Sequence, residues 1–314
     1  MDHFILSANV VLPLFLIMMA GYVMKRLDWV DESFLKRWNR VSFQFFLPIL
    51  LFMNIYQTSG NLAEIFNLKL LLFAVGSVIL SFLLLCIGIP LVEKDSRRKG
   101  VLVQGIFRSN FVIFGLPVTA ALYGDIGLAT TSIIIAVVVP LFNVLSVIVL
   151  EYYRSGRANL RVILKGIVTN PLILGSVLGI ALLVLGIRLP YFVEKTLADI
   201  SKVATPQALV ILGGSFRFSS VRHHWKPLFL GVSGRLVLVP LIFIPISILM
   251  GFRQAELVTL ISMFGAPTAV SSYTMAQQME ADDELAGQIV VFAALFSVFT
   301  MFMWIFLGKS WNFL

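Results

Sequence analysis

The sequence predicts an all-α polytopic membrane protein with ten transmembrane helices in two inverted five-helix repeats. Three observations support this fold: the composition, a series of ten apolar segments, and prolines at matching places in the two halves. Of the 314 residues, 59% are hydrophobic and 13% are charged, whereas a soluble domain has roughly 25% charged residues. These values exclude a water-soluble globular protein and a disordered chain, and the single cysteine, Cys86, excludes a disulfide scaffold.

Breaks in hydropathy and charge divide the chain into ten apolar segments, most of them close to the roughly 20 residues that a helix needs to cross a bilayer. A β-barrel would instead show alternating hydrophobicity in segments of about ten residues. No basic residue precedes the first segment, so we expect a retained helix there and not a cleaved signal peptide. The segments are Phe4–Met24, Val41–Tyr56, Leu70–Val92, Val101–Tyr123, Ile126–Leu150, Ile167–Ile187, Ile200–Phe216, Pro227–Met250, Leu257–Ala276 and Ile289–Leu307.

Basic loops set the expected orientation, because loops rich in Lys and Arg stay cytoplasmic. With the N-terminus outside, most of the 24 Lys and Arg residues fall in cytoplasmic loops, and the acidic loop 277–287 is the one weak point. We therefore expect both termini to lie outside the plasma membrane. This placement explains the net charge of +8 as membrane topology. We accordingly expect contact with the lipid bilayer and no nucleic-acid partner.

The ten segments predict an inverted repeat, because five spans are an odd number and the second half must then enter the membrane from the opposite side. We expect residues 1–153 to form the first repeat, residues 154–166 a cytoplasmic connecting loop, and residues 167–314 the second repeat. Four pairs of prolines in corresponding spans support this division, although some pairing by chance is expected. The pairs are Pro13 with Pro171, Pro48 with Pro206, Pro90 with Pro245, and Pro117 with Pro267.

The fourth and ninth segments each contain a Gly-x-Pro motif in the middle of an apolar run, Gly115 to Pro117 and Gly265 to Pro267. Proline removes a backbone donor, and glycine removes the side chain that resists unwinding. We therefore expect both helices to break, with ordinary kinks as the alternative. Free backbone groups survive at membrane depth only where protein or a watery cavity satisfies them, so matched breaks are typical of a transporter's substrate site. The polar residues beside the breaks are Asn110, Ser271, Ser272 and Tyr273.

Motifs in the second, fourth, sixth and ninth segments carry a resemblance to a known family. They are Leu47-Pro48, Ser109-Asn110-Phe111 through Phe114-Gly115-Leu116-Pro117 to Ala121-Leu122-Tyr123-Gly124, Thr169-Asn170-Pro171, and Ala266-Pro267-Thr268-Ala269-Val270 with Tyr273 and Ala276. In this order and spacing they resemble the auxin efflux carrier family over nearly the whole chain. That family contains plant auxin carriers and microbial permeases for small organic anions such as malate and malonate.

The resemblance implies that the two broken helices cross near the bilayer midplane and form the substrate site. Spans one, two, six and seven would form a scaffold, and spans three to five and eight to ten a transport domain with an elevator-like cycle. It implies carboxylate binding by Asn110, five residues before Gly115, and crossing positions at Pro117 and Pro267. The short loop after the fifth span departs from the plant carriers and argues against kinase-type regulation and auxin as substrate. The resemblance also admits a homodimer.

Two arginines, Arg108 and Arg235, lie deep in apolar spans, while no Asp or Glu lies near a span centre. Intramembrane charge is costly and usually functional, and unpaired positive charge favours an anionic substrate. The alternative is that both arginines snorkel to the cytoplasmic face. We predict that Arg108 binds substrate and that Arg235 is a second anion partner. The full set predicted to bind substrate is Asn110, Arg108, Gly115, Gly265, Ser271, Ser272, Tyr273 and Gln44.

Energy coupling stays open at this stage. Proton carriers often use a buried acid, so a proton would here travel on the substrate or on an acid at a helix end. Sodium could bind carbonyls and hydroxyls around Gly265, Ser271, Ser272 and Thr274. A uniporter or an anion exchanger fits the residues equally well. We expect neither a metal site nor another cofactor.

A membrane-embedded enzyme is the alternative from another functional class. A serine type needs Ser and His at membrane depth, an aspartyl type needs two deep aspartates, and a metalloprotease needs His-Glu-x-x-His, and the sequence has none of these. A sensor or regulatory protein on a transporter fold is a further alternative. We predict a non-enzymatic secondary or facilitative transporter of small organic anions, with mono- or dicarboxylates such as malate or malonate as substrates. Auxin-like aromatic carboxylates are the alternative substrates.

Overall fold

The computed structural model describes residues 2–58, 67–155 and 160–314. Within these ranges the chain is helical and forms no strand apart from one isolated bridge, which confirms the all-α prediction. Two π-helical turns are labelled η. The helices are α1 (Asp2–Arg26), α2 (Glu32–Val41), η1 (Ser42–Phe46), α3 (Leu47–Tyr56), α5 (Leu68–Val92), α6 (Ser96–Phe107), α7 (Phe111–Ser155), α8 (Leu160–Thr169), α9 (Pro171–Val184), α10 (Tyr191–Ser215), α11 (Phe218–Val221), α12 (Trp225–Ser233), η2 (Gly234–Leu238), α13 (Val239–Leu249), α14 (Gln254–Gly265), α15 (Ser271–Gln278) and α16 (Asp283–Ser310).

Four helices among the described residues are long and apolar enough to cross a membrane by length and composition. Each exceeds the roughly 20 residues that a bilayer core requires. This length and apolarity agree with the membrane character that the composition predicts. The four are Leu68–Val92, Phe111–Arg154, Trp225–Leu249 and Asp283–Ser310.

The second predicted span begins earlier than its hydropathy indicates. Helix α2 starts at Glu32 and continues through η1 and α3 to Tyr56, whereas the apolar run begins only at Val41. The first turns carry Glu, Lys and Arg side chains that lower the local hydropathy without breaking the helix. Asp31 caps the helix, accepting a hydrogen bond of 2.6 Å from the backbone N–H of Phe34. This hydrogen bond, with that from the Ser33 hydroxyl, lowers the pKa of the Asp31 carboxyl.

Helix α7 contains the second part of the fourth predicted span and the whole of the fifth, joined by a reversal of the chain. Gly124 has non-helical dihedral angles of φ 55° and ψ −137°. The Thr131 hydroxyl donates to the Thr119 hydroxyl at 3.0 Å, although twelve residues of straight helix would separate them by about 18 Å. The chain therefore folds back at Gly124, between the predicted spans that end at Tyr123 and begin at Ile126.

The predicted connecting loop, residues 154–166, is partly helical. Helix α8 begins at Leu160, and residues 156–159 lie outside the described part of the chain. Asn170 separates α8 from α9, and its side chain accepts a hydrogen bond of 2.9 Å from the Leu172 N–H. Pro171 then occupies the first position of α9, where its missing N–H costs nothing. The segment predicted as the sixth span is thus a pair of helices.

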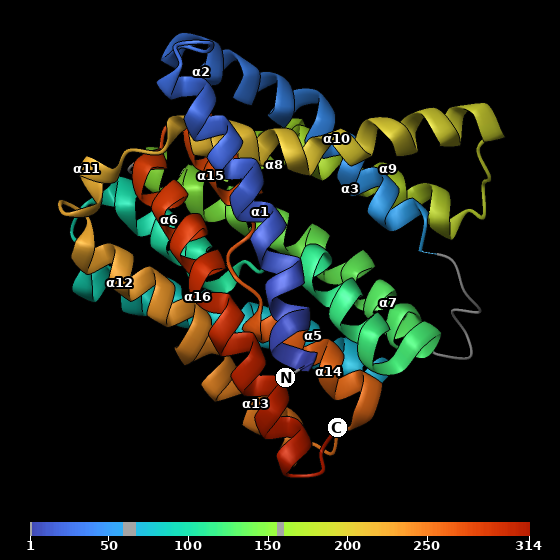
Figure 1. Ribbon diagram of the computed structural model, residues 1–314. Coiled ribbons are helices and arrows are strands. Elements are labelled where there is room, and N and C mark those ends of the chain that lie inside the picture. The colour runs from blue at the N-terminus through green and yellow to red at the C-terminus, as the bar shows by residue number, and fades with distance from the viewer. Residues whose placement is uncertain (1, 59–66, 156–159) are drawn as a thin grey trace.

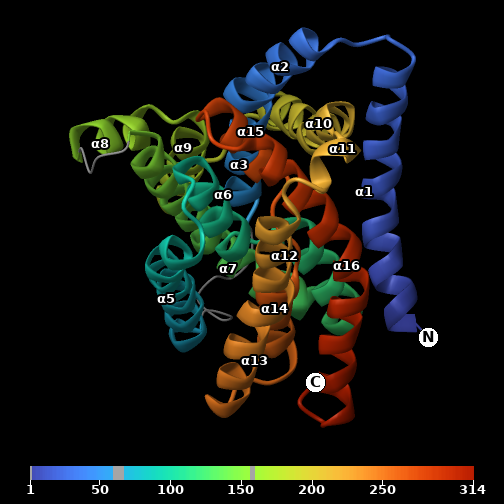
Figure 2. The same ribbon diagram turned by 90° about the vertical axis from the view of Figure 1, so that its left-hand side faces the viewer.

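The helices pack in an order that differs from their order in the chain. Helix α1 crosses and packs against α10, α3 packs against α9 and α10, and α14 packs against α7 in the interior (Figure 1). Figure 2 shows both termini at one end of the molecule and α2 at the opposite end. A large apolar cluster links α5, α6, α7, α13, α14 and α16. A smaller one joins α1 and α10 to α15 and α16, and the functional residues described next lie beside it.

Candidate functional site at a crossing of two broken helices

Two interrupted helices meet in the interior of the molecule. Helix α6 ends at Phe107 before α7 begins at Phe111, and α14 ends at Gly265 before α15 begins at Ser271. The extended residues between them form an antiparallel bridge that pairs Ser109 with Thr268. The Asn110 N–H donates to the Pro267 carbonyl at 2.7 Å, and the Thr268 hydroxyl donates to the Gly105 carbonyl at 2.6 Å. Each break therefore satisfies part of the other's free backbone.

The break in the ninth span contains Pro267, but the break in the fourth span does not lie at its Gly-x-Pro motif. Gly115 and Pro117 lie inside α7, beyond the break at residues 108–110, which corrects the prediction for that motif. Ser109 and Thr268 make the crossing, so Pro117 does not occupy a crossing position. A Cβ at Gly115 would lie 2.7 Å from the Phe111 ring. Glycine is needed there for close packing, and Pro117 lies inside the helix without ending it.

A cavity of about 180 Å³ lies between this crossing and the helices α3 and α10. Three predicted site residues line it, Arg108, Asn110 and Ser271. Their positions come from the first break and from the start of α15. The opposite wall contributes Asn54 from α3 and Thr205 from α10, and most of the remaining lining is apolar. The cavity thus has polar groups at two faces within an apolar enclosure, as small-molecule sites do.

Arg108 brings a buried positive charge to this cavity. Its side chain is 3% exposed. One terminal nitrogen donates to the Asn143 amide oxygen at 2.6 Å and to the Ser271 hydroxyl at 2.8 Å, and the other contacts the Met275 sulfur. All three partners are neutral. In the described ranges no carboxylate lies within ion-pair distance of Arg108. A buried charge without a counter-charge is costly, and an anion in the cavity would relieve that cost.

The positive ends of two half-helices lie at the same cavity. Phe111, the first residue of α7, and Ser271, the first residue of α15, both belong to its lining. A helix N-terminus presents unpaired N–H groups and a partial positive charge. Arg108 and the two helix ends therefore act in the same electrostatic sense, favouring negative charge in the cavity.

Arg235 has a different environment from Arg108. Its side chain is 1% exposed and does not line the cavity. Its guanidinium donates to the backbone carbonyls of Ala266, Ile106, Phe107, Met263 and Phe264 at 2.8, 3.1, 3.2, 2.7 and 2.7 Å. These hydrogen bonds use all five N–H donors of an arginine. The predicted role of Arg235 as an anion partner is therefore wrong, because no donor is left for a ligand.

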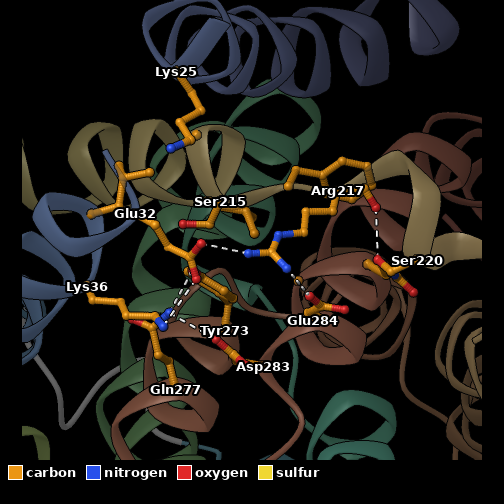
Figure 3. Close-up of a pocket in the computed structure, with 16 residues that line it drawn as sticks. Lys25, Glu32, Lys36, Ser215, Arg217, Ser220, Tyr273, Gln277, Asp283 and Glu284 are labelled. Carbon is orange, nitrogen blue, oxygen red and sulfur yellow. Dashed lines mark hydrogen bonds and ion pairs between the residues drawn. The ribbon is translucent and has the colours of Figure 1, made fainter. Parts of the chain in front are cut away.

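A second cavity, of about 300 Å³, lies between α2, the end of α10, α15 and the start of α16 (Figure 3). Figure 3 shows Arg217 between two carboxylates, with ion pairs of 2.7 Å to Glu32 and 3.2 Å to Glu284. Tyr273 lines this second cavity and not the first, and its hydroxyl accepts a hydrogen bond of 3.1 Å from the Gln277 amide. The structure thus separates Tyr273 from Arg108 and Asn110.

The remaining predicted site residues lie outside both cavity linings. Gly265 packs where a Cβ would lie 2.8 Å from the Met301 sulfur. Ser272 is buried, and its hydroxyl has no hydrogen-bond partner among the described residues. Gln44 is exposed on η1, whereas Asn54 of the same span faces the cavity. The signal that could have found Asn54 is its i, i+4, i+7 spacing with Leu47 and Leu51, which also line the cavity.

Comparison with known proteins identifies the family. A family model for membrane transport proteins matches the chain twice, over residues 7–160 and residues 154–305. The chain belongs to the auxin efflux carrier family of membrane transport proteins. Together with the apolar helices, this membership makes it an integral membrane protein of a transporter-type family.

Relatives of the same length carry transporter names. The chain is similar to an uncharacterized transporter of Methanothermobacter thermautotrophicus, with 23% identity over 300 residues, covering 95% of this chain and 97% of that protein. It is also similar to the uncharacterized transporter YfdV of Escherichia coli K12, with 22% identity over 313 residues, covering 95% and 96%. The likeness therefore extends over whole chains and is not confined to the crossing.

Proposed function

We propose that this chain carries small organic anions, mono- or dicarboxylates such as malate or malonate, across the plasma membrane. The observation that carries the proposal is the buried guanidinium of Arg108, which faces the first cavity. Its hydrogen-bond partners among the described residues are all neutral. A substrate carboxylate would supply the missing negative charge. Asn110 and Ser271 stand beside it with hydrogen-bonding side chains.

The proposal includes ten membrane spans in two inverted repeats. The tandem match of the family model supports two repeats, and each half contains one interrupted helix that takes part in the crossing. With both ends of the chain at one end of the molecule, an even number of crossings is the consistent topology (Figure 2). The distribution of Lys and Arg favours the outside for the termini and the cytoplasm for α2 and the second cavity.

An elevator-like cycle would move one group of helices against another. We assign α1, α2, α3, α8, α9 and α10 to the scaffold and the remaining long helices to the transport domain. The first cavity lies between the two groups, with Asn54 and Thr205 on the scaffold and Arg108 on the transport domain. Two polar links join the groups beside the second cavity: Arg217, which bridges Glu32 of α2 and Glu284 of α16, and a hydrogen bond of 2.7 Å from Asn39 to Gln277. A sliding transport domain would have to break them.

Counterflow in proteoliposomes tests the function. Vesicles preloaded with unlabelled malate or malonate should accumulate the labelled compound when they contain the wild-type protein. Arg108→Gln should lower apparent affinity by about tenfold to a hundredfold, because a hydrogen bond to a charged group contributes about 1.5–3 kcal/mol. Arg188→Gln is the matched control, since Arg188 is exposed ahead of α10. Unchanged affinity in Arg108→Gln would contradict the assigned site.

The same measurement separates the carrier from a sensor on a transporter fold. Ligand-induced thermal stabilisation of the wild-type protein without any counterflow would favour the sensor. Accumulation that responds to an imposed membrane potential would indicate net charge movement, whereas potential-independent accumulation would indicate neutral exchange.

A further inference from the structure

Arg235 lies where the carbonyl ends of two half-helices meet. Three of its acceptors, Met263, Phe264 and Ala266, belong to the break at the end of α14. The other two, Ile106 and Phe107, are the last residues of α6. One planar side chain therefore binds both interrupted helices at once.

The five carbonyls are those that lose their helical donors at the breaks. In a continuous helix the Met263 carbonyl would accept from residue 267, which is a proline without an N–H. The Ile106 carbonyl would accept from the N–H of Asn110, which donates instead to Pro267. Buried carbonyls need a donor, and no water replaces one at membrane depth without a cavity. Arg235 takes the place of these missing donors.

The geometry of the eighth span brings Arg235 to this point. The residue lies in the π-helical turn η2, between α12 and α13. Such turns redirect side chains and are frequent at functional sites. At Gly234 an added Cβ would lie 2.9 Å from Ile106, so the backbone of the span approaches α6 closely. The short approach lets the guanidinium reach carbonyls of both breaks.

We propose that Arg235 is a positioning residue that holds the two breaks in register and neutralises their carbonyl ends. The C-termini of α6 and α14 carry partial negative charge, which the buried guanidinium cancels. The N-termini of α7 and α15 then dominate the potential at the Arg108 cavity. This electrostatic part rests on the proposed anion transport, whereas the role in register does not.

Hydrogen–deuterium exchange of the full chain in lipid nanodiscs tests the role in register without any substrate. Arg235→Met removes the charge and all five donors at similar length. We expect amides at residues 104–111 and 262–272 to exchange about tenfold faster or more, with α16 unchanged. Arg235→Lys keeps the charge and three donors, so its amide exchange rates at both breaks should increase less. This variant replaces Arg235→Met in the test if Arg235→Met does not fold.

Leu236→Ala is the matched control, because Leu236 is the buried neighbour of Arg235 on the same turn. It removes apolar packing and leaves the carbonyls paired, so it should not increase exchange selectively at the two breaks. Faster exchange at one break only, an equal increase in Leu236→Ala, or no change in Arg235→Met would overturn the proposal.

Malonate affinity by thermal shift tests the electrostatic part separately. Arg235→Met should weaken malonate binding about tenfold or more, and Arg235→Lys should recover most of that loss. Equal affinity in wild type and Arg235→Met, with wild type binding malonate, would refute the electrostatic role and leave the exchange result in force. Absence of malonate binding by the wild-type protein counts against the proposed substrate and not against Arg235 as a positioning residue.

Discussion

At the scale of single residues, the two deep arginines show how burial alone leaves function undecided. Arg108 and Arg235 are both almost fully buried. Every N–H donor of Arg235 binds a backbone carbonyl. Arg108 faces a cavity, and its own partners are an amide, a hydroxyl and a thioether. A saturated guanidinium stabilises structure, and an undercompensated one attracts an anion. The difference lies in the partners, which come from distant parts of the chain.

Asn54 and Thr205 provide a residue-scale prediction for the wall opposite Arg108. Asn54→Leu and Thr205→Val should each raise the concentration of carboxylate needed for half-maximal counterflow by about fivefold to tenfold, because each removes a neutral hydrogen-bonding group of about 1 kcal/mol. Gln44→Leu is the control, since Gln44 is exposed in the same span as Asn54. A similar change in all three variants would show that the cavity wall has no specific role.

At the scale of elements, capping residues and backbone hydrogen-bond partners decide where each helix begins and ends. Helix α2 starts well before its apolar run because Asp31 caps it and its polar first turns favour helix without favouring lipid. In the fourth predicted span, by contrast, tertiary partners and not a local cap decide where the helix ends. Residues 108–110 leave the helix where Ser109 pairs with Thr268 and the Asn110 N–H donates to the Pro267 carbonyl, and the proline seven positions beyond Asn110 stays inside α7. Local sequence preference and tertiary partners together place the ends.

Asp31 carries an element-scale prediction with a pH dependence. Asp31→Ala should lower the melting temperature at neutral pH by removing the cap on the Phe34 N–H. The folded-state pKa of Asp31 lies below its ordinary value of 3.8, so its stabilisation is present above that value and disappears as pH falls through the folded-state pKa. The melting temperatures of wild type and variant should therefore converge in acid.

Melting curves between pH 7 and pH 3, followed by tryptophan fluorescence, measure this difference. Asp28→Asn is the control, because Asp28 lies in the same loop with a positive φ of 56° that Asn tolerates. A gap between wild type and Asp31→Ala that widens in acid would contradict the assigned role of the cap.

At the scale of the whole molecule, the contacts between the proposed scaffold and transport domain are of two kinds. An apolar seam joins α1 and α10 to α15 and α16, and because hydrophobic contact is non-directional, the proposed cycle would let the two groups slide along it. The Asn39–Gln277 hydrogen bond and the Arg217 ion pairs are directional and tie the groups at one end. We expect these polar contacts to hold one conformation and the seam to permit the exchange between conformations.

A cross-link between the two groups tests this movement. In a Cys86→Ser background, oxidation of the pair Asn39→Cys and Gln277→Cys should abolish counterflow, and reduction should restore it. Substrate-dependent thermal stabilisation should survive oxidation, because neither Asn39 nor Gln277 lines the Arg108 cavity. The pair Ser42→Cys and Gln207→Cys lies within the proposed scaffold, where the native side chains are 3.4 Å apart, and should leave flux unchanged. Full counterflow with the first pair cross-linked would exclude an elevator-like cycle.

The sequence by itself determined the helical membrane class, the family, and the presence of polar and charged residues in the fourth and ninth spans. Hydropathy, charge and motif order are properties of short stretches of chain, so they can be identified without knowledge of the fold. The placement of Arg108, Asn110 and Ser271 around one cavity follows in part from this, because Arg108 and Asn110 lie in the first break and Ser271 directly follows the second.

Only the tertiary structure decided which arginine faces the cavity, where the fourth span breaks, and that Asn54 rather than Gln44 lines the site. Arg108 meets Ser271 across 163 residues, and Arg235 meets Ile106 across 129. Whether a buried donor is already satisfied depends on such distant partners, and no local pattern contains that information. The helix crossing pairs distant backbone groups. Because Arg235 binds the carbonyl ends there, the uncompensated charge beside the cavity is the positive charge of Arg108.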